Sequence, residues 1–313
     1  MNGMEWYWIV LIVAGALVLL AFFFAAYMFL FAFGSNRRSV DKLFALREAD
    51  PAPLVRMRFD TKSYMDALES ERLTLISHDG LKLSARFFPN GDTKKVAVIL
   101  HGWHSFPWWD FGKSFDILYN AGYAVLAVSQ RAQGESEGKY LTYGAKESDD
   151  LIGWLKLLID RLGEDVRIAI MGVSMGAATV LIATGKALPK QVKCAVSDCA
   201  FTSALDQFKA TTKNRFPVSR RLGEFYARTL ARMRYSDARP IDAVRRTKIP
   251  TLFLHGDADT FVPYPMMQQL FEASAAPEKS MWTSPNAVHA EAAMTNPEQY
   301  ADAVLPFLNR YLG

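Results

Sequence analysis

One serine in this sequence lies at a turn that suits nucleophilic chemistry. Ser174 is the centre of the pentapeptide GVSMG at 172–176, between an apolar strand predicted over 166–171 and a helix predicted over 176–186. Flanking glycines allow the tight backbone that lifts a serine hydroxyl above the end of a strand. The N–H groups at the start of the helix then favour negative charge beside that hydroxyl. The pattern predicts a nucleophile at Ser174, and the alternative is a tight turn without chemistry.

A second pentapeptide, GESEG at 134–138, has the same glycine and serine spacing. The preceding predicted strand ends at Ser129, glutamates flank Ser136 on both sides, and no helix of small residues follows directly. We therefore predict that 134–138 is a loop at the carboxyl edge of the sheet and that Ser136 is not the nucleophile.

A serine nucleophile needs a base, and the chain has five histidines from which to choose. In folds that carry the serine on a strand–turn–helix, the acid and then the histidine follow it in chain order. His255 and His289 are the two that follow Ser174. His255 ends a predicted strand, where its side chain packs locally, whereas His289 lies in a loop before the last helix. We predict His289 as the base, with an exposed loop imidazole as the alternative.

The acid is expected in the loop after the strand predicted over 251–255. Asp257 and Asp259 both lie there. The spacing leaves both open, with some preference for Asp259 because it lies further from the strand end and closer to the histidine loop.

Two backbone N–H groups are expected to bind the oxyanion that forms when the serine attacks. One belongs to Met175, the residue after the nucleophile. The other is predicted at Trp103, because Gly102 in the sequence HGW at 101–103 lets that backbone approach closely. A simple turn at the end of the strand is the alternative for these residues.

The elements that position these residues alternate between strands and helices. Two strands joined by a turn, 72–77 and 81–88, precede the alternating part, which predicts a mostly parallel sheet covered by helices on both faces. The other predicted strands are 96–100, 123–129, 166–171, 192–198, 251–255 and 280–283, and the other predicted helices are 108–121, 144–162, 176–186, 265–274 and one from 291.

The N-terminal segment 6–33 carries no charged residue. Its 28 residues would form a helix of roughly 42 Å, enough to cross the roughly 30 Å of bilayer hydrocarbon. We predict an uncleaved transmembrane anchor, and a cleaved signal peptide or a buried core helix is the alternative. Basic residues follow the segment and none precedes it, which predicts a single pass with the C-terminal domain in the cytoplasm. These basic residues are Arg37, Arg38, Lys42 and Arg47.

The rest of the chain divides into a linker with a lead-in helix at 34–70 and a catalytic domain at 71–313. The sequence Asp50-Pro51-Ala52-Pro53 is expected to break any helix, and the lead-in helix is expected from Asp60 to Glu69.

Cys194 and Cys199 are five residues apart in a predicted strand, too far for a disulfide, and free thiols suit a reducing compartment.

An insertion at about 201–248 lies where a lid is expected, and it is strongly basic. From 208 to 248 there are 12 basic and three acidic residues. Arg221, Arg228 and Arg232 share one helical face. The apolar residues Leu222, Phe225, Tyr226, Leu230 and Met233 share another. Such a helix can lie on a membrane, and a solvated face is the alternative.

Composition limits the remaining classes of function. The chain has 313 residues, half of them hydrophobic, and a net charge of +4, which excludes a mainly disordered protein and gives no indication of nucleic-acid binding. Cysteine and histidine do not occur at zinc spacing, and neither a metal nor an organic cofactor is expected.

Taken together, these segments resemble the α/β-hydrolase family over about 72–313, and most closely its bacterial membrane-anchored serine hydrolases of unassigned substrate. In that family the acid follows the glycine of the penultimate strand by three residues, which implies Asp259. Relatives usually have histidine where this chain has Gln133, and the difference bears on the 130–138 loop and substrate preference. The segments are HGW (101–103), SQRAQGESEGKYLTYG (129–144), MGVSMGAATV (171–180), SDCAFTS (197–203), LFLHGDADTFVP (252–263) and His289.

The resemblance implies acyl transfer by a Ser174–Asp259–His289 triad on a small acyl ester, thioester or lipid-like substrate. A peptidase or acyltransferase would use the same triad, and a binding module without activity is a further alternative. A serine nucleophile argues against epoxide hydrolases and dehalogenases of this fold, which use a carboxylate. The aromatic cluster formed by Trp103, Phe106, Trp108, Trp109 and Phe111 either lines an acyl pocket or packs between helices, and we favour packing for most of its members.

Overall fold

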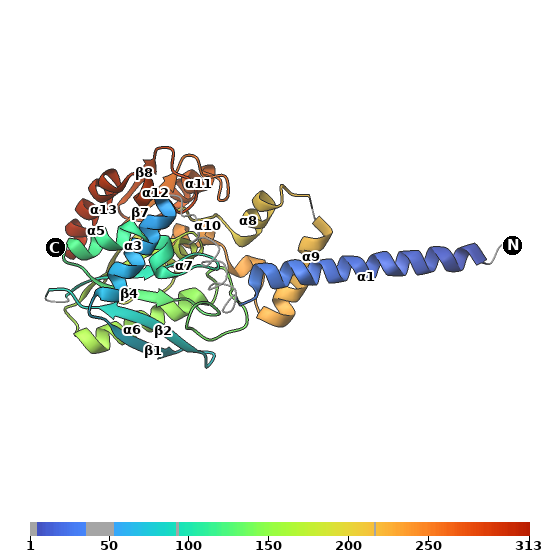
Figure 1. The fold of residues 1–313 in the computed structure, drawn as a ribbon, viewed down its shortest axis with the longest axis horizontal. Helices are drawn as coiled ribbons and strands as arrows, with labels where there is room; N and C mark the ends of the chain where they lie inside the picture. The colour runs from blue at the N-terminus through green and yellow to red at the C-terminus, as the bar shows by residue number, and fades with distance from the viewer. Residues whose placement is uncertain (1–4, 36–52, 92–93, 216) are drawn as a thin grey trace.

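The apolar N-terminal segment forms one continuous helix. The computed structural model describes residues 5–35, 53–91, 94–215 and 217–313, and Figure 1 shows helix α1 (Glu5–Phe33) extending away from the body of the protein. Within those residues, α1 is the one helix long and apolar enough to cross a membrane. Its first part, 6–20, is exposed, whereas Ala25, Phe29 and Phe33 are buried. The helix therefore has a free part and a part that packs on the body.

The body is built on an eight-stranded sheet with the strand order β1-β2-β4-β3-β5-β6-β7-β8. β1 and β2 form an antiparallel hairpin, β2 is antiparallel to β4, and the other neighbours are parallel. This confirms the predicted mostly parallel α/β architecture. The strands are β1 Glu71–Ile76, β2 Lys82–Phe88, β3 Lys95–Leu100, β4 Ala124–Ser129, β5 Arg167–Val173, β6 Val192–Asp198, β7 Thr251–Gly256 and β8 Lys279–Ser284.

Helices cover both faces of the sheet, because the central strands are apolar on both sides. Val96, Val98 and Leu100 of β3 point into one core with α6 and α7, and Ala97 and Ile99 point into the other with α5 and α13. The helices of the body are α3 Pro53–Ala67, α4 Pro107–Phe111, α5 Lys113–Asn120, α6 Glu147–Leu162, α7 Met175–Thr184, α8 Ala204–Thr211, α9 Pro217–Tyr226, α10 Pro240–Ala243, α11 Pro265–Ala273, α12 Ala292–Thr295 and α13 Pro297–Leu312.

Two predicted helices are each broken into two. The helix predicted over 108–121 is α4 and α5, separated at Gly112, whose φ of +40° suits glycine and ends the first helix. The helix predicted from 291 is α12 and α13, separated at Asn296 because Pro297 has no N–H to continue a helix.

The helix predicted over 144–162 begins later, at Glu147. The carboxylate of Glu147 accepts hydrogen bonds from the amides of Thr142 (2.6 Å) and Gly144 (2.9 Å). These bonds hold the preceding residues in a turn, so they do not extend the helix.

The lead-in helix is also displaced from its predicted position. α3 begins at Pro53 and ends at Ala67, so the prediction of a helix from Asp60 to Glu69 is wrong in both bounds. Proline is tolerated in the first turn, where its missing N–H has no partner to lose. The side chain of Arg58 fixes α3 to the body through the carbonyl oxygen of Trp109 at 2.9 Å. Two predictions concern residues that lie outside the described part of the chain. They are the helix break at Asp50, Pro51 and Ala52 and the basic residues that orient the anchor.

The region predicted as a lid folds into short helices beside α1. α8 and α9 lie near the base of α1, and α9 continues as a π-helix, Ala227–Ala231, which ends at Arg232 with φ +53°. The predicted regular helix with one apolar face through Met233 is therefore wrong. Met233 is buried, whereas Phe225 and Leu230 are exposed.

Both cysteines are buried and free. Cys194 lies within β6 and Cys199 just after it, in agreement with the prediction that they do not pair.

Candidate active site

Ser174 lies at the turn between β5 and α7. Its φ of +56° is unusual for a residue with a side chain, and the local packing explains why the flanking positions are glycine. A Cβ at Gly172 would lie 2.3 Å from the backbone of Gly176, and a Cβ at Gly176 would lie 2.0 Å from the carbonyl oxygen of Leu100. The sequence therefore imposes a tight turn that raises the Ser174 hydroxyl above the sheet.

The structure brings Ser174, His289 and Asp259 together. His289 Nε2 lies 2.9 Å from Ser174 Oγ, and His289 Nδ1 lies 2.7 Å from Asp259 Oδ2. The other carboxylate oxygen of Asp259 accepts the amides of Phe261 and Val262, both at 2.9 Å. Three segments that are distant in the sequence thus form one hydrogen-bonded chain from hydroxyl to imidazole to carboxylate.

The other acidic candidate, Asp257, makes a different contact. Its carboxylate accepts the amide of Asn286 at 2.7 Å, which fixes the loop before His289. Spacing alone could not separate the two aspartates, and the structure brings Asp259 to the imidazole.

Ser136 is buried in the loop at the sheet edge. Its hydroxyl accepts the amide of Ser84 at 2.9 Å and donates to the carbonyl oxygen of Ser129 at 2.5 Å. Both contacts join backbone segments, so Ser136 has a structural role in holding the loop against β2.

His255 is a further residue of the site that sequence reasoning placed elsewhere. Its Nε2 lies 3.2 Å from Asp259 Oδ2 and 2.9 Å from the carbonyl oxygen of Val262. Burial of Asp259 opposes its ionisation, but hydrogen bonds from His255 and His289 outweigh burial and hold the pKa of Asp259 well below its usual range. Asp259 is therefore ionised and able to stabilise an imidazolium at His289.

Asp198 and Cys199 lie behind the triad, at the end of β6. Burial raises the pKa of Asp198 to about 6, although the neighbouring His255 and His289 oppose the shift. The amide of Ser174 donates to the backbone carbonyl oxygen of Asp198 at 2.8 Å. Neither residue was predicted to belong to the site, although both lie in the segment SDCAFTS (197–203), and the signal available was their position at the carboxyl end of a central strand.

Ligand atoms of Cys199, Asp259 and His289 lie within 4.8 Å of one another, as a metal site would require. The nitrogens of His289 are already hydrogen-bonded on both sides. Burial also raises the pKa of Cys199 well above its usual value, which disfavours the thiolate that binds metals. The donor set fits an acid–base chain better than a metal.

The predicted oxyanion residues lie beside Ser174. Met175 is the first residue of α7, where a backbone N–H has no partner within the helix. A Cβ at Gly102 would lie 2.9 Å from Asp110 Oδ2 and 3.1 Å from Ser174 Cβ, so glycine lets the HGW backbone approach Ser174 without displacing these side chains. The Gly102 amide donates to Asp110 Oδ2 at 2.5 Å, which fixes the loop that carries Trp103.

Buried hydrogen bonds from Gln130 hold the HGW loop at His101. The Gln130 amide N–H donates to His101 Nε2 at 3.2 Å, and the Thr179 hydroxyl donates to Gln130 Oε1 at 3.2 Å. The Gln130 side-chain amide also donates to the carbonyl oxygen of His101. These contacts connect β3, β4 and α7, so His101 has a structural role. Burial lowers the pKa of His101 and keeps it neutral.

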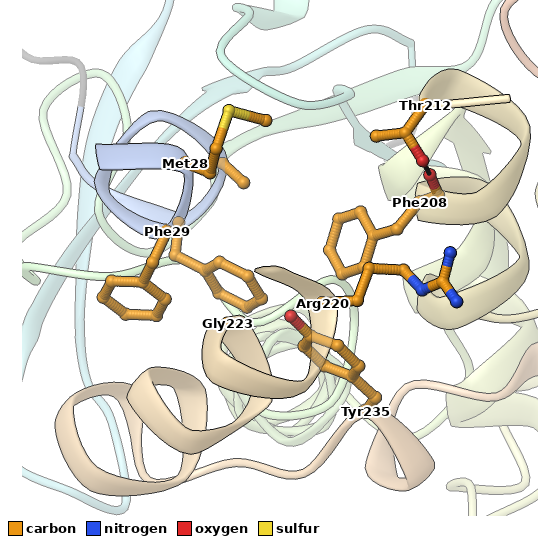
Figure 2. A pocket seen from close by; sticks show the side chains of 9 residues that line it. Met28, Phe29, Phe208, Thr212, Arg220, Gly223 and Tyr235 are labelled. Atoms are coloured by element: carbon orange, nitrogen blue, oxygen red, sulfur yellow. Dashed lines mark hydrogen bonds between the residues drawn. The ribbon is translucent and has the colours of Figure 1, made fainter. Parts of the chain in front are cut away.

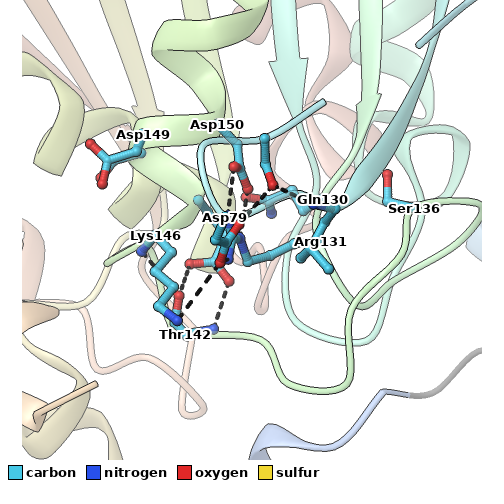
Figure 3. Close-up of polar contacts among 12 residues, drawn as sticks. Asp79, Gln130, Arg131, Ser136, Thr142, Lys146, Asp149 and Asp150 are labelled. Carbon is cyan, nitrogen blue, oxygen red and sulfur yellow. Dashed lines mark hydrogen bonds and ion pairs between the residues drawn. The ribbon is translucent and has the colours of Figure 1, made fainter. Parts of the chain in front are cut away.

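Arg131 is the centre of a buried ion-pair network in the adjacent loop (Figure 3). It contacts Asp150 through Nε and Nη2, both at 2.6 Å, and Asp79 at 2.9 and 3.2 Å. Arg131 thereby joins the turn of the first hairpin, the loop after β4 and helix α6. Burial opposes ionisation of Asp79, but bonds from Arg131 and Ser77 hold its pKa well below the usual value.

Gln133, where histidine was expected from the resemblance, is buried in the same loop. Its Oε1 lies 3.3 Å from the amide nitrogen of Ser105, so it contacts the loop that follows HGW. Gln133 thus contacts the loop that follows HGW and does not contact the triad.

An apolar cavity of about 290 Å³ lies directly in front of Ser174. Trp103, Met175, Phe201 and Phe261 line it from the body, together with residues of α1. Of the aromatic cluster near the oxyanion strand, Trp103 reaches this cavity. The others pack elsewhere: Phe106 stacks on Trp108, Trp108 and Trp109 contact Phe59 of α3, and Phe111 is in the core.

Comparisons with known proteins agree with this arrangement. A profile of the prolyl oligopeptidase family matches residues 109–313. The esterase Pf2001 of Pyrococcus furiosus superposes with a TM-score of 0.65 at 28% identity, covering 79% of this chain and 94% of that one. The uncharacterized protein YqkD of Bacillus subtilis is 25% identical over 254 residues, 80% of this chain and 83% of its own length. The α/β-hydrolase domain-containing protein WAV2 of Arabidopsis thaliana is 30% identical over 197 residues, 60% of this chain and 61% of its own.

Proposed function

This chain belongs to the prolyl oligopeptidase family within the α/β-hydrolase superfamily, and we propose that it is a serine hydrolase that cleaves carboxylic ester or thioester bonds. The hydrogen-bonded chain from Ser174 through His289 to Asp259 carries the proposal. The apolar cavity in front of Ser174 supports an acyl substrate, because it offers an aliphatic chain a surface of matching polarity.

The proposed reaction has two steps. His289 Nε2 takes the proton of Ser174 as Oγ attacks the carbonyl carbon, and the amides of Trp103 and Met175 bind the oxyanion. The imidazolium returns the proton to the leaving alcohol or thiol, which gives an acyl-serine. Water then loses a proton to His289, attacks the acyl-serine and releases the acid, while the proton returns to Ser174. Asp259 holds the imidazole tautomer and stabilises its cation throughout.

Peptidase chemistry is the second candidate, and the family match itself supports it. The same triad transfers an acyl group from an amide, or to an acceptor other than water, so the pocket and acceptor make the difference. A binding module without activity has less support, because the hydroxyl, imidazole and carboxylate are within hydrogen-bond distance in the required order.

We further propose that α1 is a retained single-pass membrane anchor with the catalytic domain in the cytoplasm. The packing of Ala25, Phe29 and Phe33 against the body supports retention, since cleavage of a signal peptide would expose that surface. The orientation rests on Arg37, Arg38, Lys42 and Arg47.

The first test is labelling with a fluorophosphonate probe, which reacts with activated serines. We expect labelling of the detergent-solubilised full chain and its loss in Ser174→Ala. A panel of matched ester, thioester and peptide substrates then separates the two candidates. A folded wild type that the probe does not label would overturn the proposal.

A further inference from the structure

The last third of α1 is built into the catalytic domain. Trp103 Nε1 donates to the carbonyl oxygen of Ala32 at 2.8 Å, and the hydroxyl of Tyr143 donates to the same oxygen at 2.9 Å. Carbonyl groups in the last turn of a helix have no partner within the helix, and here the body supplies two donors. Phe33 contacts Tyr143 with ring centroids 5.0 Å apart. This end of α1 therefore has a fixed position relative to Ser174.

The same turn of α1 forms a wall of the cavity in front of Ser174. Met28, Phe31 and Ala32 line that cavity with Trp103. Met28 and Ala32 also line a smaller cavity of about 60 Å³ between α1 and the lid helices. Figure 2 shows Met28 and Phe29 of α1 facing Phe208 and Tyr235 across this space. Two neighbouring cavities thus lie beside the helix that we propose spans the membrane.

The depth of these residues follows from helix geometry. Trp6, Tyr7 and Trp8 suit the membrane interface, so the hydrocarbon part of the helix begins at Ile9. About 20 residues, or roughly 30 Å, are needed to cross the hydrocarbon, and that length ends at Met28. Ala32 lies about 6 Å further along the axis, within the headgroup layer.

The lid contacts α1 at a level inside the hydrocarbon. Phe22 lies 6.4 Å from Phe225 and 5.9 Å from Tyr226 between ring centroids, and it precedes Met28 by roughly 9 Å along the axis. Phe225 is 50% exposed and Leu230 is 46% exposed, beside α1. Amphipathic helices at membrane surfaces bury their apolar side chains by about 5–10 Å, which matches this depth.

We propose that the substrate is an ester of a membrane lipid whose acyl chain enters the cavity along α1, and that Met28, Phe31 and Ala32 determine the chain length accepted. This rests on the proposed serine hydrolase function. The cavity lies at the boundary between hydrocarbon and headgroups, where the ester carbonyls of lipids also lie. The lipid then needs to move little out of the bilayer to bring its carbonyl to Ser174.

The test compares tryptophan substitutions at two positions of α1 that lie within one helical turn of each other. Met28→Trp fills the cavity. Leu30→Trp adds the same side chain at a position that is 54% exposed and is not part of the cavity lining. The full-length protein in nanodiscs is assayed with p-nitrophenyl esters from acetate to palmitate. We expect Met28→Trp to lower the ratio of palmitate to acetate kcat/KM by about tenfold or more, the discrimination that one methylene can provide. Leu30→Trp should keep the wild-type ratio.

Labelling separates failure of this inference from failure of the proposed function. If the probe labels Met28→Trp but its chain-length profile equals that of wild type, α1 is not the acyl wall and the inference is wrong. If wild type itself is not labelled at Ser174, the hydrolase proposal fails first. Should Met28→Trp not fold, Met28→Ala gives the opposite change, a preference shifted towards longer chains, and an unchanged preference there would equally overturn the inference.

Discussion

His255 Nε2 lies 3.2 Å from Oδ2 of Asp259, the same carboxylate oxygen that contacts the imidazole of His289. A second, fully buried histidine thus contacts the acid of the triad. It helps to keep Asp259 ionised and fixes the direction of its carboxylate, so we regard His255 as a positioning residue that acts through Asp259.

Replacement of His255 by alanine should therefore lower kcat more than it changes KM. A hydrogen bond to a charged group contributes about 1.5–3 kcal/mol, which corresponds to a loss of about 10- to 150-fold. Ester hydrolysis measured across the pH range is the readout, and His255→Gln should restore part of the rate. A role limited to packing would leave kcat intact in every variant that folds.

The two aspartates of the 257–259 loop should differ sharply. Asp259→Asn is expected to lower kcat by about 10⁴-fold, because the amide favours the wrong imidazole tautomer. Asp257→Asn is the matched control, since Asp257 contacts the amide of Asn286 and not His289. The rate at which a fluorophosphonate probe labels Ser174 is measured for both variants. Equal losses in the two would argue that the acid has been assigned to the wrong residue.

The sheet could be predicted because its signals are local. Each central strand is a short apolar run, and the alternation of strands and helices indicates a parallel sheet without knowledge of contacts. Ser174 and His289 could be predicted for the same reason. The glycine-flanked turn indicates Ser174, and the order of residues along the chain indicates His289. The choice between Asp257 and Asp259 needed the resemblance, because both lie in the same loop within three residues.

Other features depend on contacts between distant residues. Arg131 pairs with Asp79, 52 residues away, and no local pattern indicates such a partner. The break between α4 and α5 occurs at Gly112, which packs close to Met294 of a distant helix. The role of α1 in the cavity was missed for a physical reason. Lipid and a protein pocket both select apolar side chains, so hydropathy cannot distinguish Met28 from Leu30.

The Arg131 network should contribute strongly to stability. Arg131→Met leaves the carboxylates of Asp79 and Asp150 without their buried partner, which should lower the free energy of unfolding by about 3–5 kcal/mol. Arg72→Met is the matched control, because Arg72 pairs with Glu135 on the surface and such pairs contribute about 0–1 kcal/mol. Thermal unfolding of both variants tests this. Similar Tm values for the two would contradict the assignment of stability to the buried network.

Asp198 should make stability depend on pH. Because burial raises its pKa from 3.8 to about 6, its contribution to stability is fully present below pH 3.8 and is lost as the pH rises through 6. Asp198→Asn stays neutral and avoids this loss. The difference between variant and wild type should therefore grow from pH 4 to about pH 6 and then stay constant, reaching up to about 3 kcal/mol in favour of the variant.

Denaturant unfolding at a series of pH values measures this difference. Asp257→Asn is again a suitable control, since Asp257 is exposed and should show no comparable gain at high pH. The backbone bond from the Ser174 amide to the Asp198 carbonyl oxygen survives the substitution, so the nucleophile keeps its turn. A variant that is less stable than wild type at pH 8 would mean that the neighbouring histidines stabilise the charge of Asp198 more than burial opposes it, so that its pKa is not raised in the folded state.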